Sequence, residues 1–224
     1  MLRVENIRKS FGKDNRVLDS VSFCALKGQA VCIAGKNATG KTTLIKIICG
    51  ILSSDSGTVS ANGRISFISQ EPAILPELSV NDNLKLWYAS QNASGPHWKD
   101  DSIETILGLK SYRRKKAKTL SGGMKKRLSI AAALALPPDW LLMDEPFAAI
   151  DTDGCRDIIS LLDKLKKSGT GIIFTSHQNE HISAVADRIL ILNNGTIEEM
   201  SLANSTDCDI STQYTARSMS QKDR

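Results

Sequence analysis

The feature that most constrains the fold is a short glycine-containing turn between an apolar run and a helical pattern. Residues 30–34 form a continuous apolar run, of the kind that is buried on both faces of a parallel sheet. Gly35 and Gly40 follow this run, and apolar residues then recur at helical spacing until Gly50, which can end a helix. The order strand, turn and helix is typical of an α/β protein with a mostly parallel sheet.

The turn matches the pattern G-x-x-x-x-G-K-[ST] at every position, with a second threonine, Thr43, directly behind it. Its residues are Gly35, Lys36, Asn37, Ala38, Thr39, Gly40, Lys41 and Thr42. Backbone N–H groups at such a helix N-terminus surround phosphate groups, and Gly40 lets the backbone approach where a Cβ would collide. The pattern therefore predicts a nucleotide site in which Lys41 reaches the outer phosphates and the Thr42 hydroxyl binds Mg²⁺.

Two adjacent carboxylates, Asp144 and Glu145, follow an apolar run at residues 141–143 that predicts another buried strand. A carboxylate at the end of a buried strand can approach a metal ion at the neighbouring strand–helix turn. We expect Asp144 to hold Mg²⁺, directly or through water, and Glu145 to face the γ-phosphate and polarise an attacking water. The simpler alternative is an ordinary surface pair of acids after a core strand.

A second candidate anion site lies at Ser121, Gly122 and Gly123, which head an alanine-rich helical pattern that Pro137 stops. A hydroxyl, two glycines and a helix N-terminus can together bind an anion. One ATP does not need two such sites from one chain, so we expect this one to serve the nucleotide of another subunit. A glycine turn that caps a helix is the alternative interpretation.

The remaining chain alternates apolar strands with helical patterns. A buried strand is predicted at 171–175, and Asn-Gly turns predict hairpins at 58–68 and from 189 onward. Helical patterns from residue 76 to about 136 predict a helical subdomain inserted into the α/β core, with Ser79 as a helix cap. Residues 201–224 are rich in Ser and Thr, and we expect them to form a flexible polar tail.

Composition excludes several classes of protein. The 224 residues carry 29 Lys and Arg against 24 Asp and Glu, and no apolar run approaches the roughly 20 residues of a membrane-spanning helix. Five cysteines without a C-x-x-C pair indicate a reduced, cytosolic protein. We expect the basic run at 113–116 to be solvated surface, His97 and His181 to face solvent, and Trp87 and Tyr88 to belong to the core of the insert. No nucleic-acid partner is expected.

The motifs at 35–42, 120–124 and 144–145, together with Gln70, Asp151 and His177, occur in the order found in ABC-type ATPases. The chain resembles the nucleotide-binding subunit of an ABC transporter over about residues 1–200, and 120–128 is most similar to the exporter branch. The resemblance implies a P-loop NTPase core with an N-terminal antiparallel β part and an inserted helical subdomain. It also implies that Phe11 stacks on adenine and that Gln70 contacts the metal and the water. His177 would hold the γ-phosphate, and Asp151 would lie at a dimer contact.

The resemblance further implies an ATPase that uses ATP and Mg²⁺ and pairs head to tail with a second ATPase subunit, either a copy or a relative. A separate integral-membrane permease would carry the substrate, and the chain would lie in the cytoplasm at the inner face of the membrane. We expect the apolar loop at Ile74 and Leu75 to contact this permease, unless it packs under the insert. A soluble ABC-type ATPase of repair, assembly or translation is the alternative function. The main departures from the family pattern are Ala38, where glycine is common, and Met124, where glutamine is common.

Overall fold

The computed structural model describes residues 1–12 and 15–200. The strands are β1 Leu2–Ser10, β2 Arg16–Ala25, β3 Ala30–Ala34, β4 Ser56–Ala61, β5 Ile65–Ile68, β6 Trp140–Met143, β7 Gly171–Ser176, β8 Arg188–Asn193 and β9 Thr196–Met200. The helices are α1 Lys41–Ile48, α2 Val80–Ser90, α3 Ile103–Ile106, α4 Gly122–Ala133, α5 Thr152–Lys167 and α6 Asn179–Val185, with 3₁₀ turns η1 Lys110–Tyr112 and η2 Ala117–Thr119.

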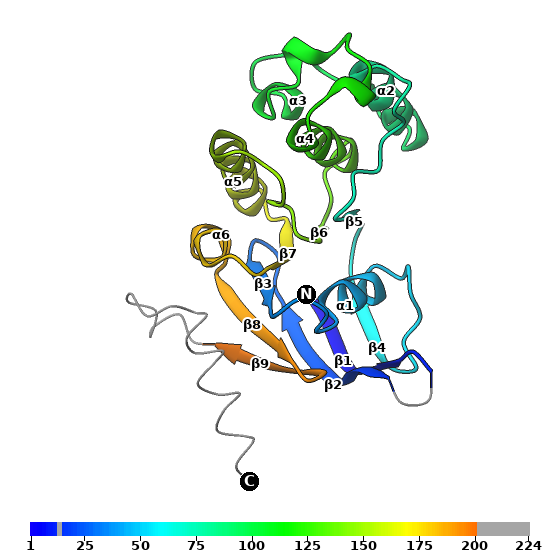
Figure 1. The fold of residues 1–224 in the computed structure, drawn as a ribbon, viewed down its shortest axis with the longest axis vertical. Helices are drawn as coiled ribbons and strands as arrows, with labels where there is room; N and C mark the ends of the chain where they lie inside the picture. The colour runs from blue at the N-terminus through cyan, green and yellow to red at the C-terminus, as the bar shows by residue number, and fades with distance from the viewer. Residues whose placement is uncertain (13–14, 201–224) are drawn as a thin grey trace.

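The larger sheet has six strands in the order β5-β6-β7-β3-β8-β9 (Figure 1). All neighbours from β5 to β8 pair in parallel, and only β9 runs antiparallel, to β8. Strands β3, β6 and β7 are buried at every residue, which explains why each appears in the sequence as a continuous apolar run. This sheet confirms the predicted P-loop NTPase core, and β8 with β9 confirms the predicted final hairpin.

A three-stranded antiparallel sheet, in the order β2-β1-β4, forms the N-terminal part. Helix α1 packs between the two sheets through side chains such as Leu44 and Ile45, in one core cluster with residues of β1, β2, β3, β6 and β7. Because α1 is fixed from both sides, the turn that precedes it is held at the edge of the larger sheet.

The other face of the larger sheet is covered by helices, among them α4, α5 and α6. Helices α2, α3 and α4 follow β5 in the chain and gather in the upper part of Figure 1, before the chain returns to the sheet as β6. Helix α2 begins as predicted, since the Ser79 side chain accepts a hydrogen bond from the backbone N–H of Asp82.

The hairpin predicted at 58–68 is wrong. Strand β4 pairs with β1 in the antiparallel sheet, whereas β5 pairs in parallel with β6 in the larger sheet. The turn between them is held by the start of β6: Arg64 N–H donates to Asp139 Oδ2 at 2.8 Å, and Trp140 Nε1 donates to the Asn62 carbonyl at 3.1 Å. These bonds direct the chain from one sheet into the other.

Several surface predictions are also tested by the fold. Tyr88 is buried and donates to Glu104 at 2.6 Å, but Trp87 is 37% exposed, so the core prediction holds for only one of the pair. His181, expected in solvent, is half-buried and stacks on Phe147 with a centroid distance of 4.4 Å. His97 and the basic run at 113–116 are exposed, as predicted.

The two apolar side chains of the loop expected to contact a permease differ in exposure. Ile74 packs partly buried against the core, while Leu75 is 47% exposed. The predicted tail at 201–224 lies outside the described residues. Among the described cysteines, Cys24, Cys32, Cys49 and Cys155 are all free thiols. No helix within residues 1–12 and 15–200 is long and apolar enough to span a lipid bilayer.

Candidate functional site

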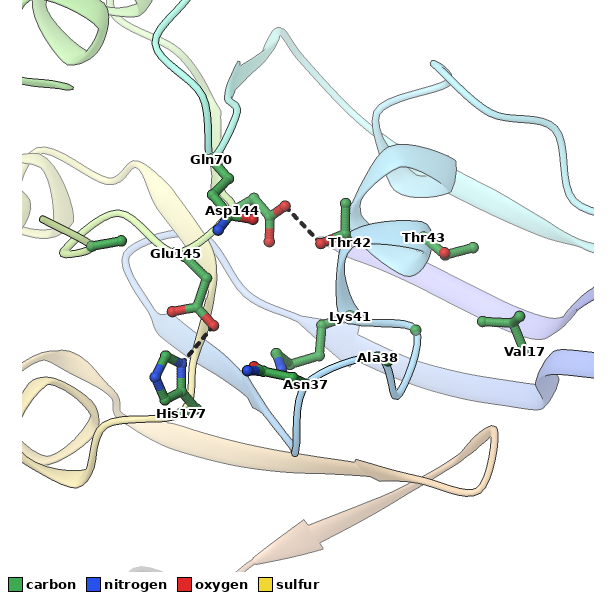
Figure 2. A pocket seen from close by; sticks show the side chains of 12 residues that line it. Val17, Asn37, Ala38, Lys41, Thr42, Thr43, Gln70, Asp144, Glu145 and His177 are labelled. Carbon is green, nitrogen blue, oxygen red and sulfur yellow. Dashed lines mark hydrogen bonds and ion pairs between the residues drawn. The ribbon is translucent and has the colours of Figure 1, made fainter. Parts of the chain in front are cut away.

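A pocket of about 430 Å³ opens at the edge of the larger sheet where β3, β5, β6 and β7 end. Figure 2 shows that its side chains converge from the turn before α1 and from the ends of these strands. This is the edge at which α/β proteins bind ligands. The lining residues are Val17, Asn37, Ala38, Gly40, Lys41, Thr42, Thr43, Gln70, Asp144, Glu145, Ala148 and His177.

The turn before α1 forms the floor of the pocket. Lys41 folds back across it, and its Nζ donates to the carbonyls of Gly35 at 2.7 Å and Lys36 at 2.9 Å. Gly40 has φ +102°, and a Cβ there would lie 2.7 Å from Val17 Cγ1, so no other residue fits. Ala38 also takes a positive φ of 63°, which explains why glycine is common at this position in the family.

The predicted metal ligands meet directly. Thr42 Oγ1 donates to Asp144 Oδ2 at 2.8 Å, and Thr175 Oγ1 donates to Asp144 Oδ1 at 2.7 Å. Both carboxylate oxygens of Asp144 therefore accept a hydrogen bond. The residue is only 2% exposed, and buried polar groups need such partners. The same Thr175 oxygen accepts the Glu145 backbone N–H at 2.8 Å, so one hydroxyl orients both acidic residues.

Glu145 and His177 form the opposite wall of the pocket. Glu145 Oε1 lies 3.0 Å from His177 Nδ1, as the dashed line in Figure 2 shows. The Glu145 backbone has φ +46°, an uncommon conformation for a residue with a side chain and one that clusters at active sites. The Gln70 side chain enters from the loop after β5 and lies above Asp144 in the same figure.

The charges of the pocket act on one another. Burial lowers the pKa of Lys41, while attraction by Glu145 and Asp144 opposes this shift. The Cys32 thiol lies in β3, and burial followed by repulsion from Glu145 raises its pKa. Within this pocket the Lys41 ammonium is the cation that can attract phosphate groups, and it lies on the same floor as the backbone N–H groups of the turn.

The oxygen ligands fit Mg²⁺. A threonine hydroxyl, a carboxylate and a glutamine amide oxygen are hard donors, and Mg²⁺ in proteins usually takes one or two carboxylates with water and phosphate. Thr42, Asp144 and Gln70 line one pocket and supply this set. In the described part of the chain no three or more His, Cys, Asp or Glu side chains cluster as a metal site, so no carboxylate-rich alternative exists there.

Some predicted site residues lie away from this pocket. Ser121 caps α4 through a bond from Met124 N–H at 3.2 Å, and Asp151 caps α5 through a bond from Gly154 N–H at 2.8 Å. Phe11 is 49% exposed at the end of β1, which excludes a buried core role. None of the following lines the pocket: Phe11, Gly35, Lys36, Thr39, Ser121, Gly122, Gly123 and Asp151.

Gly35, Lys36 and Thr39 do not line the pocket, but they are part of the turn before α1. Thr39 Oγ1 donates to the Lys36 carbonyl at 3.0 Å, and a Cβ at Gly35 would lie 2.6 Å from the Leu192 carbonyl oxygen. The start of α4 instead lies against the loop before α5, since a Cβ at Gly123 would be 3.1 Å from the Ala149 carbonyl oxygen.

Sequence reasoning did not find Thr175 or Val17. Thr175 sits at the end of β7, just before Ser176 and His177, and its position at a strand end was its only signal. Val17 belongs to β2 and reaches the pocket only because the antiparallel sheet packs beside α1. Both roles depend on contacts between segments that are distant in the chain.

Comparison with known proteins identifies the family. The family model "ABC transporter" matches residues 18–148. The linearmycin resistance ATP-binding protein LnrL of Bacillus subtilis is 33% identical over 221 residues, covering 92% of this chain and 70% of that protein. The lipopolysaccharide export system ATP-binding protein LptB of Escherichia coli is 30% identical over 211 residues, and the match covers 87% of this chain and 87% of that protein.

A solved structure of the ATP-binding cassette MJ0796, a dimer in a post-hydrolysis state with ADP and Pi, shares the fold. Its TM-score is 0.80 at 24% identity, with 90% of this chain and 99% of that chain covered. The family match, the relatives and the pocket agree on one identity. The chain belongs to the ABC transporter family, and the relatives named here are its ATP-binding proteins.

Proposed function

We propose that the pocket at the end of β3 binds the phosphates of ATP and that its acidic wall activates the attacking water. The observation that carries this proposal is the chain of contacts from Thr42 through Asp144 and Thr175 to Glu145. Phosphoryl transfer to water depends on positioning and on charge stabilisation, and this chain of contacts fixes the groups that would supply both.

The turn residues would hold the triphosphate. Backbone N–H groups of residues 35–43 point to the phosphates, and the Lys41 ammonium neutralises the outer ones after exchanging its carbonyl partners for phosphate oxygens. Mg²⁺, when bound, neutralises charge on the outer phosphates. Thr42 and Asp144 would hold it, with Gln70 as a further ligand.

The opposite wall would handle the water. Glu145 orients the water and accepts its proton, and His177 holds the γ-phosphate while its ring fixes the Glu145 carboxylate at 3.0 Å. The Gln70 amide, on the loop after β5, would contact the water and the metal. These roles agree with the convergence of the three side chains on one pocket.

The second half of each ATP site would come from another subunit. Ser121 and Gly122 are exposed at the start of α4 and lie outside the pocket, so they are accessible to a second chain. In a head-to-tail pair, residues 121–123 would face the γ-phosphate bound by the partner, with Asp151 at the contact and Phe11 against the adenine. The MJ0796 cassette, which shares the fold, is a dimer, and this supports the pairing of two such chains.

Dimer closure on ATP would drive a separate permease. Residues 1–200 would form the ATPase domain, and the insert at about 76–136 would face the permease from the cytoplasmic side of the membrane. The exposed Leu75 is a better contact residue than the half-buried Ile74. LnrL is a resistance protein and LptB an export protein, and both relatives are consistent with export.

The proposal is tested by separating hydrolysis from binding. Glu145→Gln should bind ATP with Mg²⁺ as the parent does but lose hydrolysis by about a hundredfold or more, because an amide cannot accept the proton. Lys41→Ala should instead weaken ATP binding itself. Glu180→Gln, at an exposed glutamate of α6 outside the pocket, is the matched control and should hydrolyse ATP normally. Parental hydrolysis by Glu145→Gln would refute the assignment of the base.

A further inference from the structure

One buried cation behind the ATP pocket has no part in the proposed function. Lys126 lies on α4, the helix that Ser121 caps, and is 2% exposed. A buried ammonium costs free energy unless hydrogen bonds and nearby charges compensate its lost hydration. Its position between the insert and the acidic wall therefore requires an explanation.

The Lys126 ammonium binds three backbone carbonyls. Its Nζ donates to Ser69 O at 2.7 Å, to Gln70 O at 3.0 Å and to Asp144 O at 3.3 Å. An ammonium has three N–H donors and no acceptor, so these carbonyls use its full capacity. Within the described residues it makes no ion pair with a carboxylate, and all of its hydrogen bonds go to the main chain.

These three carbonyls belong to the peptides that orient the predicted catalytic groups. The Ser69 and Gln70 carbonyls are on the two peptides that flank the Gln70 Cα. The Asp144 carbonyl and the Glu145 N–H belong to one planar peptide, so holding one fixes the other. Lys126 binds that peptide at its oxygen, and Thr175 binds it at its nitrogen at 2.8 Å.

The three hydrogen bonds to carbonyl oxygens hold the Lys126 ammonium in this place. Burial lowers its pKa to about 8, and the carboxylates of Asp144 and Glu145 oppose that shift. The Asp144 carboxylate oxygens are already bound by Thr42 and Thr175, so Lys126 acts on the main chain rather than on the acid itself.

We propose that Lys126 is a positioning residue that ties α4 to the peptides of Gln70 and Glu145. A shift of residues 121–123 at the start of α4 would therefore also shift the groups around the attacking water. The inference rests on the proposed function, because it assumes that Gln70 and Glu145 act on that water. Lys126 does not touch ATP, and its effect is on the rate of hydrolysis rather than on nucleotide affinity.

The test compares kcat and KM for ATP in Lys126→Met, which keeps the aliphatic length and removes the donors. We expect kcat to fall at least about tenfold while KM and ATP affinity change less than about threefold, since small displacements of positioned groups slow chemistry strongly. Lys126→Arg, which keeps the charge and the donors on a larger head group, should recover part of the kcat that Lys126→Met loses. Lys125→Met, the same change one residue earlier on α4, is the matched control and should behave as the parent.

The inference is overturned if Lys126→Met keeps parental kcat, or if ATP affinity falls in parallel with kcat. An arginine variant that melts like the parent yet is as slow as the methionine variant also overturns it. If Lys126→Met melts below the assay temperature, the comparison is made at a temperature at which both proteins are folded, and parental kcat there has the same meaning. Glu145→Gln is measured beside them: if it is inactive while Lys126→Met is not, the inference alone fails, whereas an active Glu145→Gln refutes the proposed function.

Discussion

At the scale of single residues, one hydroxyl orients the acidic wall of the ATP pocket. Thr175 is fully buried, donates to Asp144 Oδ1 at 2.7 Å and accepts the Glu145 N–H at 2.8 Å. A hydroxyl is the smallest group that can do both at once. Removing it leaves a buried donor and a buried acceptor without partners, which is costly.

Thr175→Val preserves the shape of the side chain and removes both hydrogen bonds. We expect the free energy of unfolding to fall by about 1–3 kcal/mol, from the unsatisfied buried groups. We also expect kcat to fall about tenfold or more, from the freed Glu145 peptide. Urea unfolding and phosphate release measure the two effects. Thr175→Ser, which keeps the hydroxyl, should lose much less of the rate, and equal losses in both variants would contradict this role.

The described cysteines differ in how readily they can react. Burial raises the pKa of the Cys49 thiol to about 12, whereas Cys24 is exposed on β2. Because the thiolate is the nucleophile, native Cys49 should alkylate with iodoacetamide at pH 8 at least about a hundredfold more slowly than Cys24. Peptide mass spectrometry measures both rates, and both thiols should react in urea. Equal native rates would show that Cys49 is not protected.

At the scale of elements, the pairing of β6 with β7 depends on one glycine, which leaves room for a large side chain on the neighbouring strand. Trp140, fully buried at the start of β6, pairs with Gly171 at the start of β7. A Cβ at Gly171 would lie 2.2 Å from Trp140 Cζ3, which is far inside any permitted contact. The large indole and the missing side chain therefore depend on each other.

Gly171→Ala should lower the free energy of unfolding by about 1–3 kcal/mol, because the indole must shift in a packed core. The double variant with Trp140→Phe should cost less than the sum of the two single changes, since the smaller ring leaves room for the methyl group. Thermal or urea unfolding of all four proteins measures this coupling. Strict additivity would contradict the predicted clash.

The elements also show how far the sequence could predict this structure. The runs that became β3, β6 and β7 were identified because strands buried on both faces are apolar at every position. The hairpin at 58–68 was wrong because an Asn-Gly turn fixes a local bend but not the sheet that each strand joins. Within the site, motifs that are contiguous in the chain were found. Thr175 and Lys126 were missed because their bonds reach segments far along the sequence.

At the scale of the whole molecule, the chain contains both halves of the proposed ATP site in separate places. The pocket lies at the sheet edge, and Ser121 and Gly122 are exposed at the start of α4, outside that pocket. Two head-to-tail copies would complete two sites without any further component. Gly122 is the position to enlarge, because it is exposed and a Cβ there would meet nothing closer in its own chain than Ala149 Cβ, at 4.0 Å.

The molar mass of Glu145→Gln in solution, measured by light scattering with and without ATP and Mg²⁺, tests this account most directly. Blocked hydrolysis should trap the closed pair, so the mass should rise from 24.4 kDa without nucleotide to about twice that value with ATP. Gly122→Trp added to Glu145→Gln should still bind ATP but remain monomeric. A mass that stays at 24.4 kDa with ATP across a wide range of protein concentrations would contradict the shared site.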